Sequence, residues 1–224
     1  MVIPACNEEK YLEATLNSLK LQEFKDYETI VVCNGCTDNT EAIAKKQENT
    51  TIISFPEANV SKARNIGAGK ASGKVLLFLD ADSTLEQDAL TKINEQFTDN
   101  HYAATTTSKP SIPSLKFNLA MGLKNFYLST GLYEGCSGAL ICRREDFDKA
   151  NGYDSDLIVK EHRKLIIKLK RATRKEFACI DTPITTSMRR YQQWGLTKAT
   201  LFWTKQWLKN YFGDLKKSEY EKVR

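Results

Sequence analysis

Two aspartates, Asp80 and Asp82, directly follow five apolar residues at positions 75–79. An uninterrupted apolar run of this length is typical of a strand that is buried on both faces of a parallel sheet. Residues i and i+2 of an extended chain point to the same side, so both carboxylates are expected to face one cleft. Two neighbouring anions suit a hard divalent cation, Mg²⁺ or Mn²⁺, that itself holds a diphosphate. A solvated turn is the alternative, because so short a motif has low specificity.

Strands and helices alternate through the first hundred residues. We expect strands at 2–3, 29–32, 51–55 and 75–79, and helices at 10–21, from about 39 to 47, and at 62–71. This rhythm predicts a right-handed parallel sheet with helices on both faces. Ligands of such sheets bind beyond the carboxyl ends of the strands. The loops 5–9, 33–38 and 80–82 are therefore expected to meet at one crevice.

The second half of the sequence is less regular. Residues 108–114 hold two prolines and predict a flexible loop. The other expected elements are a helix to about 97, a strand at 103–107, a helix at 115–128, a glycine turn and strand at 134–142, a helix at 146–150, a basic helix at 161–170 and a strand at 178–180. No internal repeat or low-complexity tract is evident.

The composition is that of one large globular domain, or of one domain with an appendage. The 224 residues are 41% hydrophobic and 27% charged, with a net charge of +5. A mildly basic chain suits an anionic substrate or a membrane surface. No apolar stretch approaches the roughly 20 residues that span a bilayer, and no signal peptide is evident. We therefore expect a cytoplasmic protein.

Six cysteines in a chain of this length do not predict a dense disulfide framework. Cys33 and Cys36 form a Cys-x-x-Cys pair at the end of a predicted strand, which matches thioredoxin-like placement. A thioredoxin-like role would leave the acidic motifs unexplained. A zinc site is poorly supported, since only His101 and His162 are present to complete one.

Four short motifs occur in chain order: Pro4-Ala5-Cys6-Asn7-Glu8, Cys33-Asn34-Gly35-Cys36-Thr37-Asp38, Ala63-Arg64-Asn65-Ile66-Gly67 and Asp80-Ala81-Asp82. Together they resemble the family 2 glycosyltransferases, inverting enzymes that transfer a sugar from a nucleotide-diphosphate donor. The resemblance covers roughly residues 2–165. It implies a GT-A-like, mostly parallel α/β domain at 1–190. Its nucleotide-binding half would be 1–100 and its acceptor half 101–190, and a helical tail would follow at 191–224.

The resemblance also implies a set of donor-binding residues. Glu8 is suited to accept a hydrogen bond from a ribose hydroxyl, and Asn34 or Asp38 is suited to pair with the edge of the base. Arg64, with Lys62 nearby, suits a phosphate or the base. A surface charge is the alternative for Glu8 and Arg64. The full nucleotide-sugar set is Pro4, Ala5, Glu8, Asn34, Asp38, Lys62, Arg64, Asp80 and Ala81, with Asp82 and Asp80 as ligands of Mn²⁺ or Mg²⁺.

Cys33 occupies the position at which the family usually has an aspartate that reads the base. A thiol does not accept a strong hydrogen bond from an imide N–H. The base, uracil or guanine, therefore stays open.

Inverting transfer to a hydroxyl needs a general base, which the family takes from a Glu-Asp pair at a helix start. This chain has Glu161 and His162 there. Three alternatives remain: His162 is the base, Glu161 is the base, or the acceptor is a phosphate that needs none.

Other segments suggest contacts to the acceptor and the diphosphate. Gly135, Ser137 and Gly138 match the glycine-rich acceptor segment of the family, which permits close approach of a sugar to the backbone. Arg189 or Arg190 is expected to reach the diphosphate.

The tail alternates aromatic and basic residues: Phe202, Trp203, Trp207, Leu208, Tyr211 and Phe212 with Lys198, Lys205, Lys209, Lys216 and Lys217. Such a helix suits a membrane interface. It equally suits packing onto the catalytic domain or onto a second copy.

The expected function is metal-assisted transfer of a hexose, with inversion, to a glycan or polyprenyl-phosphate acceptor. The enzyme would act at the cytoplasmic face of a membrane, in peripheral contact with it through the tail, and would bind no nucleic acid. The alternative is a non-catalytic nucleotide-sugar-binding or scaffolding protein.

Overall fold

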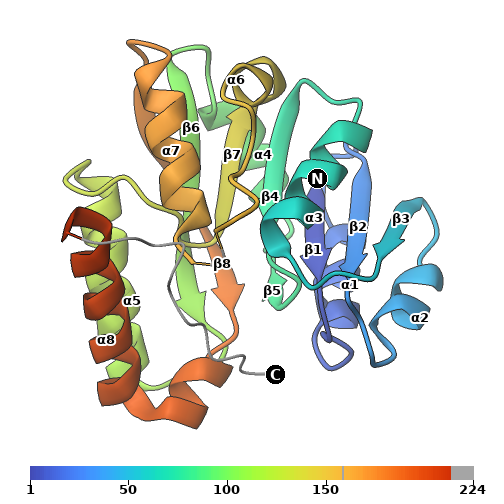
Figure 1. Ribbon diagram of the computed structural model, residues 1–224, viewed down its shortest axis with the longest axis horizontal. Helices are drawn as coiled ribbons and strands as arrows, with labels where there is room; N and C mark the ends of the chain where they lie inside the picture. The colour runs from blue at the N-terminus through green and yellow to red at the C-terminus, as the bar shows by residue number, and fades with distance from the viewer. Residues whose placement is uncertain (158, 213–224) are drawn as a thin grey trace.

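The computed structural model describes residues 1–157 and 159–212. Within these ranges the chain forms an eight-stranded mixed sheet with helices on both faces (Figure 1). The strand order is β3-β2-β1-β4-β7-β6-β8-β5. The expected α/β architecture with a largely parallel sheet is confirmed, since four of the seven strand pairings among the described residues are parallel.

The first half is the predicted alternation of strands and helices. Its strands are β1 (Val2–Ala5), β2 (Thr29–Asn34), β3 (Thr50–Phe55) and β4 (Val75–Leu79), all mutually parallel where they pair. Its helices are α1 (Leu12–Lys20), α2 (Thr40–Lys45) and α3 (Val60–Lys70). The apolar runs that predicted β1, β2 and β4 lie in the interior, with Ile3, Val31 and Leu79 completely buried.

The second half reverses the strand direction at the centre of the sheet. Its strands are β5 (Ser83–Thr84), β6 (His101–Pro110), β7 (Ala139–Arg143) and β8 (Glu176–Thr186). Its helices are α4 (Ala89–Gln96), α5 (Leu115–Ser129), α6 (Arg144–Lys149), α7 (Glu161–Arg171) and α8 (Arg189–Phe212). β7 runs antiparallel to both β4 and β6, whereas β8 is parallel to β6 and antiparallel to β5.

Two predictions about this half are wrong. The loop expected at 108–114 begins later, because β6 continues to Pro110 in register with β8. The strand expected at 178–180 is present but too short, since it is only a part, near the start, of the eleven-residue β8. Buried polar residues lie in the missed part of each strand: Ser108 in β6 and Thr182 in β8.

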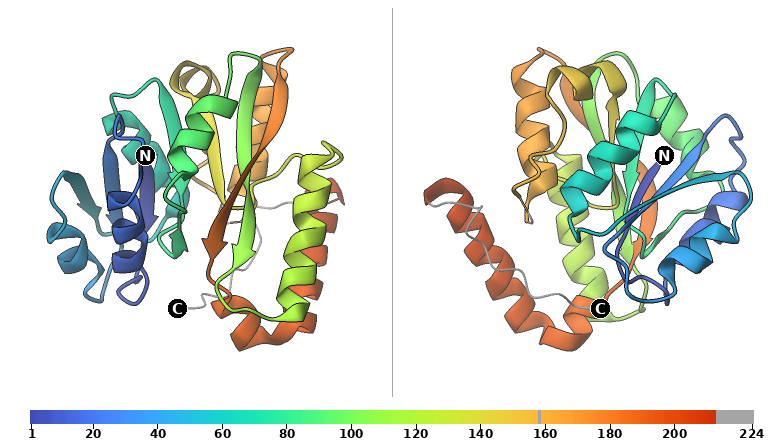
Figure 2. Two further views of the ribbon diagram at one scale, coloured as in Figure 1. Left: turned by 180° about the vertical axis from the view of Figure 1, so that it is seen from behind. Right: turned by 45° about the vertical axis from the view of Figure 1, so that its right-hand side comes forward.

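Each face of the sheet has its own apolar core. On one face, Leu12 and Leu16 of α1 and Leu90 and Ile93 of α4 pack on the strands. On the other, residues of α3, α6 and α7 do so, and Leu165 of α7 is among the most deeply buried. Figure 2 shows the two helical layers from behind and after a turn of 45°.

The C-terminal helix is broken near its start. Gly195 of α8 has a left-handed φ of 73° with ψ of 160°, and the chain beyond it angles away from the sheet (Figure 2). Phe202 lies 5.1 Å from Trp194, ring centroid to ring centroid. The predicted aromatic stripe otherwise falls largely outside the described side chains, as do residues 213–224. No helix among the described residues is long and apolar enough to cross a membrane.

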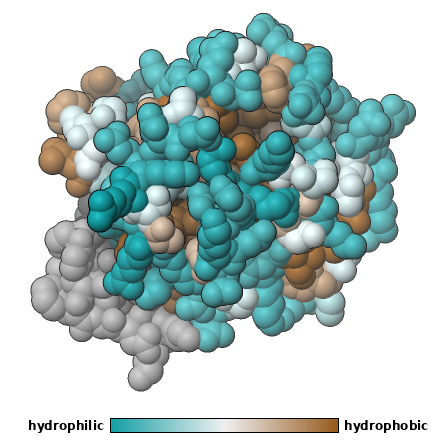
Figure 3. All heavy atoms as spheres, turned by 90° about the horizontal axis from the view of Figure 1, so that it is seen from above, coloured by the Kyte–Doolittle hydropathy of each residue, from teal (hydrophilic) through white to brown (hydrophobic). Residues whose placement is uncertain are grey.

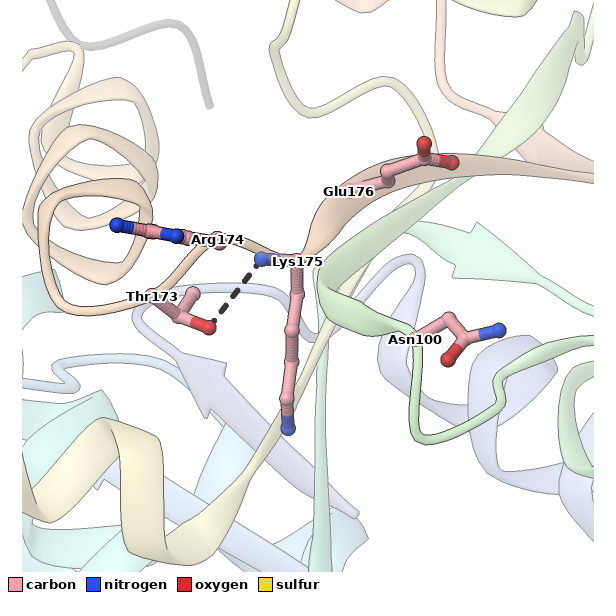
Figure 4. Close-up of a pocket in the computed structure, with 5 residues that line it drawn as sticks. All are labelled: Asn100, Thr173, Arg174, Lys175 and Glu176. Carbon is pink, nitrogen blue, oxygen red and sulfur yellow. Dashed lines mark hydrogen bonds between the residues drawn. The ribbon is translucent and has the colours of Figure 1, made fainter.

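The end of the sheet where β6 and β8 begin carries mostly hydrophilic side chains (Figure 3). A hollow of about 410 Å³ lies there, lined by Asn100, Thr173, Arg174, Lys175 and Glu176 (Figure 4). These residues stand at the opposite end of β8 from Arg189, which follows its other end. The hollow therefore belongs to a different end of the molecule from the predicted crevice.

The packing of α3 on the sheet generates a matched test with two glycines of one helix. A Cβ at Gly67 would come within 2.4 Å of Val2 Cγ1, whereas a Cβ at Gly69 would meet nothing within 4 Å. We expect Gly67→Ala to lower the free energy of unfolding by about 1–3 kcal/mol through overpacking. Gly69→Ala should raise it by about 0.5–1 kcal/mol, because alanine has the higher helix propensity.

Urea unfolding of both variants measures the two effects. A Gly67→Ala protein as stable as the wild type would show that α3 is free to shift away from β1.

Candidate active site

The carboxyl ends of β1, β2 and β4 bring the three predicted loops to one edge of the sheet, here called the carboxyl edge. The first two loops are joined directly. Asn7 Nδ2 donates to Thr37 Oγ1 (3.0 Å), and the Glu9 N–H donates to Asp38 Oδ2 (3.2 Å). The third loop is tied to α1, since Thr15 Oγ1 donates to the Ala81 carbonyl (2.8 Å). Glu8 and Asp82, from the first and third loops, share one partner.

That partner is Arg189, at the start of α8. Its guanidinium donates to both carboxylate oxygens of Glu8, at 2.6 and 2.7 Å, and lies 3.2 Å from Asp82 Oδ2. The guanidinium also stacks over the Tyr11 ring, 5.0 Å from its centroid. A planar fork that binds one carboxylate with two hydrogen bonds is the strong geometry for such a pair. Arg190, the neighbouring residue, lies instead over the Trp194 ring at 5.1 Å.

Arg64 forms a second bridge deeper in the molecule. Its side chain is 3% exposed, and it contacts Asp80 Oδ1 and Glu161 Oε1 at 2.8 Å each. It also lies 5.4 Å from the centroid of the Tyr153 ring. Burial acts to lower the pKa of Arg64, but Glu161 and Asp80 outweigh burial and raise it. Arg64 therefore stays a cation, and it joins the Asp-x-Asp turn to the start of α7.

The two aspartates of the turn lie in different surroundings. The Asp80 side chain is half exposed, whereas that of Asp82 is 15% exposed. Burial raises the pKa of Asp82 to about 7; attraction to Arg189 opposes this shift, and repulsion from Asp80 and Glu8 adds to it. Glu8 and Asp82 thus share one guanidinium charge at this point, with Asp80 nearby as a further anion.

Glu161 and His162 occupy separate environments although they are adjacent. Glu161 is held by Arg64. His162 Nδ1 lies 2.9 Å from the Tyr153 hydroxyl, and the two rings pack edge to face. Burial lowers the pKa of His162 well below its usual value, and the cations Arg64 and Lys124 lower it further. His162 is therefore a neutral imidazole at pH 7 in this state.

The residues expected to read the base are engaged within the fold. Asn34 is 3% exposed, and its amide donates to the Ala5 carbonyl (2.9 Å) and accepts from the Asn59 N–H (3.1 Å). Cys33 is 1% exposed. Asp38 accepts hydrogen bonds from Thr40 and Glu9, which together outweigh burial and lower its pKa. These side chains fix the loops that carry them.

Several other candidates also have structural contacts. Pro4 and Ala5 lie within β1, and the Ala5 carbonyl additionally accepts from Cys36 Sγ at 3.4 Å. Lys62 is paired with Glu57 at the surface. The structure therefore does not bring Lys62 into contact with the carboxylates of the carboxyl edge.

The glycine-rich segment is shaped by packing. A Cβ at Gly138 would come within 2.4 Å of Thr106 Oγ1, and one at Gly135 within 2.3 Å of the Tyr133 ring. Ser137 Oγ lies 2.7 Å from Ser108 Oγ. The space beside both glycines is therefore filled by protein.

Two site residues were not identified from the sequence. Tyr153 connects Arg64 with His162. Lys124 acts on the pKa of His162 and is itself influenced by Asp80. Its signal in the sequence is that Lys116 and Lys124 are the only charged residues of α5.

The donor set fits a divalent cation only in part. Asp80 and Asp82 supply hard oxygen ligands, but each already pairs with an arginine. Among the described residues, no three His, Cys, Asp or Glu side chains are grouped to hold a metal. Mg²⁺ and Mn²⁺ are commonly held by one or two carboxylates together with substrate phosphates. The chemistry of this site thus fits a cation that arrives with a diphosphate.

Comparison with known proteins identifies the family. Residues 1–149 match the model of glycosyl transferase family 2. A glycosyltransferase named GlyA from Streptococcus pneumoniae is 35% identical over 92 residues, which are 39% of this chain and 13% of the relative. The poly(ribitol-phosphate) beta-N-acetylglucosaminyltransferase TarS of Staphylococcus aureus is 31% identical over 110 residues, 46% of this chain and 19% of the relative. The matched segments span less than a fifth of either relative.

Solved structures share the fold. TarS residues 1–349 in complex with UDP-GlcNAc superpose with a TM-score of 0.66 at 18% identity, over 98% of this chain and 60% of that one. The mannosyltransferase PcManGT of Pyrobaculum calidifontis, in complex with GDP-Man and Mn²⁺, gives a TM-score of 0.66 at 17% identity, over 86% of this chain and 58% of that one. The resemblance to a GT-A-like fold is thereby confirmed.

Proposed function

The chain belongs to glycosyl transferase family 2, and we propose that it transfers a hexose from a nucleotide-diphosphate sugar to a glycan or polyprenyl-phosphate acceptor. The observation that carries the proposal is the meeting of Glu8 and Asp82 at one guanidinium, Arg189, on the carboxyl edge. Open α/β sheets bind ligands at this edge. Relatives that share the fold bind UDP-GlcNAc or GDP-Man.

The charges of the carboxyl edge suit a diphosphate and a sugar. Arg189 is a planar cation within reach of the Asp-x-Asp turn, and guanidinium groups bind phosphates with paired hydrogen bonds. Glu8 suits a ribose hydroxyl once Arg189 turns toward phosphate. Mn²⁺ or Mg²⁺, held by Asp82 and Asp80, would neutralise the charge of the leaving diphosphate.

The reaction we propose is a direct displacement. An acceptor oxygen attacks the anomeric carbon of the sugar, the bond to the diphosphate breaks, and the configuration inverts. His162 is our choice of base for a hydroxyl acceptor, because Nδ1–H can donate to the Tyr153 hydroxyl oxygen and leave the lone pair of Nε2 to accept the proton. Arg64 and Lys124 disfavour the imidazolium. The negative charge of a bound donor offsets both cations and makes His162 a stronger base.

A lipid-linked acceptor would bring the protein to a membrane surface. The outer side of α5 carries four large apolar residues that are each between 56% and 84% exposed: Leu115, Leu119, Leu123 and Phe126. These residues recur along one face of the helix and present an apolar stripe, which suits insertion into a lipid interface. We therefore propose peripheral contact with the cytoplasmic face of a membrane through α5 and the tail that follows residue 190.

Donor binding tests the proposal. UDP- and GDP-sugars should raise the melting temperature of the full chain in the presence of Mn²⁺, because a ligand at 100 times its Kd stabilises the native state by about 2.7 kcal/mol. Asp82→Ala should abolish the Mn²⁺-dependent part of the shift. Asp88→Ala is the control, since Asp88 pairs only with Lys92 at the surface of α4 among the contacts described here.

Turnover distinguishes the two functions considered from the sequence. Release of UDP or GDP in the presence of an acceptor supports a transferase. A Mn²⁺-dependent thermal shift without turnover across glycan and polyprenyl-phosphate acceptors favours the scaffolding alternative, and no shift with any donor rejects both.

The role of His162 predicts two pH profiles that differ. A base works only when unprotonated, so activity is full above its pKa and is lost as pH falls through it. Because the pKa of His162 is lowered in the donor-free state, the acid limb of kcat/KM should lie below pH 6.5. The acid limb of kcat reports the pKa of His162 in the donor complex. It should lie at higher pH than the limb of kcat/KM, because the donor charge offsets the nearby cations. His162→Gln should reduce kcat by about 10²–10⁴-fold with the donor Kd unchanged.

Retention of wild-type kcat in His162→Gln would contradict this role. It would direct attention to Glu161 or to an acceptor phosphate that needs no base.

Membrane contact predicts co-sedimentation with anionic phosphatidylglycerol vesicles that weakens at high salt, where surface charges are screened. The double variant Leu119→Glu, Leu123→Glu should remain in the supernatant. Leu21→Glu replaces a leucine of similar exposure (60%) just after α1 and should still sediment. Equal sedimentation of both variants would rule out α5 as the contact.

A further inference from the structure

Arg189 pairs with Asp82, one of the two carboxylates that the proposed function gives to a divalent cation. It lies between Glu8 and Asp82, within 3.2 Å of an oxygen of each. Its partners come from the loops after β1 and β4, and Arg189 itself follows β8, 181 residues after Glu8 in the chain. The contact is therefore created by the fold and not by local sequence.

Resting on that proposed function, we propose that Arg189 is a placeholder for the metal. In the donor-free protein it neutralises Glu8 and Asp82. It leaves Asp82 when the metal and the diphosphate arrive together, and it then binds the diphosphate. Metal and donor binding are coupled, because the metal alone must displace a cation whereas the donor supplies Arg189 with a new anionic partner.

The electrostatics require some such cation. Glu8 and Asp82 have side chains only 12% and 15% exposed, so water screens their repulsion poorly. Asp80 adds a further negative charge that acts on Asp82.

The surroundings of Arg189 permit the exchange. Its side chain is 19% exposed, compared with 3% for Arg64. Arg189 is the first residue of α8, and its N–H is held only by the Ser187 hydroxyl at 3.3 Å among the contacts described. Six residues on, Gly195 breaks the helix. A rotation of the side chain off the Tyr11 ring is therefore sufficient, without movement of the sheet.

Mn²⁺ binding to the nucleotide-free full chain tests the proposal, with free Mn²⁺ measured by electron paramagnetic resonance. Arg189→Ala should bind Mn²⁺ about tenfold more tightly than the wild type, since one competing charge is removed. Mn²⁺ should also raise the melting temperature of Arg189→Ala more than that of the wild type. Arg190→Ala removes the same charge from the next position, which faces Trp194, and should leave the Mn²⁺ affinity unchanged.

UDP and GDP provide the second readout. In the wild type, either nucleotide should tighten Mn²⁺ binding strongly. In Arg189→Ala the same nucleotide should tighten it less, because the diphosphate has lost a partner. Arg189→Lys keeps the charge without the planar fork, so the effect of nucleotide on its Mn²⁺ affinity should be intermediate between those of the wild type and Arg189→Ala. This variant preserves the test if Arg189→Ala does not fold.

An Mn²⁺ affinity of Arg189→Ala that equals or falls below that of the wild type overturns the placeholder role. Donor-dependent turnover by the wild type would then still support the proposed function. Absence of Mn²⁺ binding by all variants, with and without nucleotide, would reject metal-assisted transfer itself.

Discussion

The structure depends on the pairing of four carboxylates with two arginines at the carboxyl edge of the sheet. Arg64 joins Asp80 to Glu161, and Arg189 joins Glu8 to Asp82. Each arginine connects the first half of the chain with the second or with its C-terminal helix. Removing one member of such a partly buried pair leaves an uncompensated charge, which is more costly than the pair itself is stabilising. The acidic turn after β4 therefore receives its counter-charges from the preceding helix α3 and from the start of α8.

Much of the fold could be predicted from local sequence, because the first half obeys simple periodicities. The continuous apolar runs of β1, β2 and β4 are buried on both faces of the sheet, as such runs require. The same reasoning failed at the end of β6, where Ser108 places a hydroxyl group in the interior beyond the predicted strand 103–107. Ser108 Oγ lies 2.7 Å from Ser137 Oγ, 29 residues away in the chain. A polar residue satisfied by a distant segment looks like a loop residue until that segment is placed.

The candidate site shows the same division between position and role. The motifs correctly indicated which loops reach the carboxyl edge, because strand ends are local features. They did not indicate that the Asn34 side chain forms its hydrogen bonds with Ala5 and Asn59. Nor did they indicate that Thr106 and Ile184 fill the space beside Gly138. Tyr153 was likewise not recognised as the link between Arg64 and His162. Each of these facts is a contact between segments far apart in sequence, which spacing alone does not specify.

The two arginines are not equivalent, and the difference has a physical cause. Arg64 packs against the Tyr153 ring with its side chain almost wholly buried. Separating its guanidinium from Asp80 and Glu161 would therefore leave unpaired charges inside the protein. Arg189 stands at the rim, where water or a phosphate can replace its partners. A site with one fixed and one exchangeable cation keeps the start of α7 in place relative to the Asp-x-Asp turn. If Arg189 is the placeholder that we propose, any rearrangement on ligand binding is expected at the end where α8 begins.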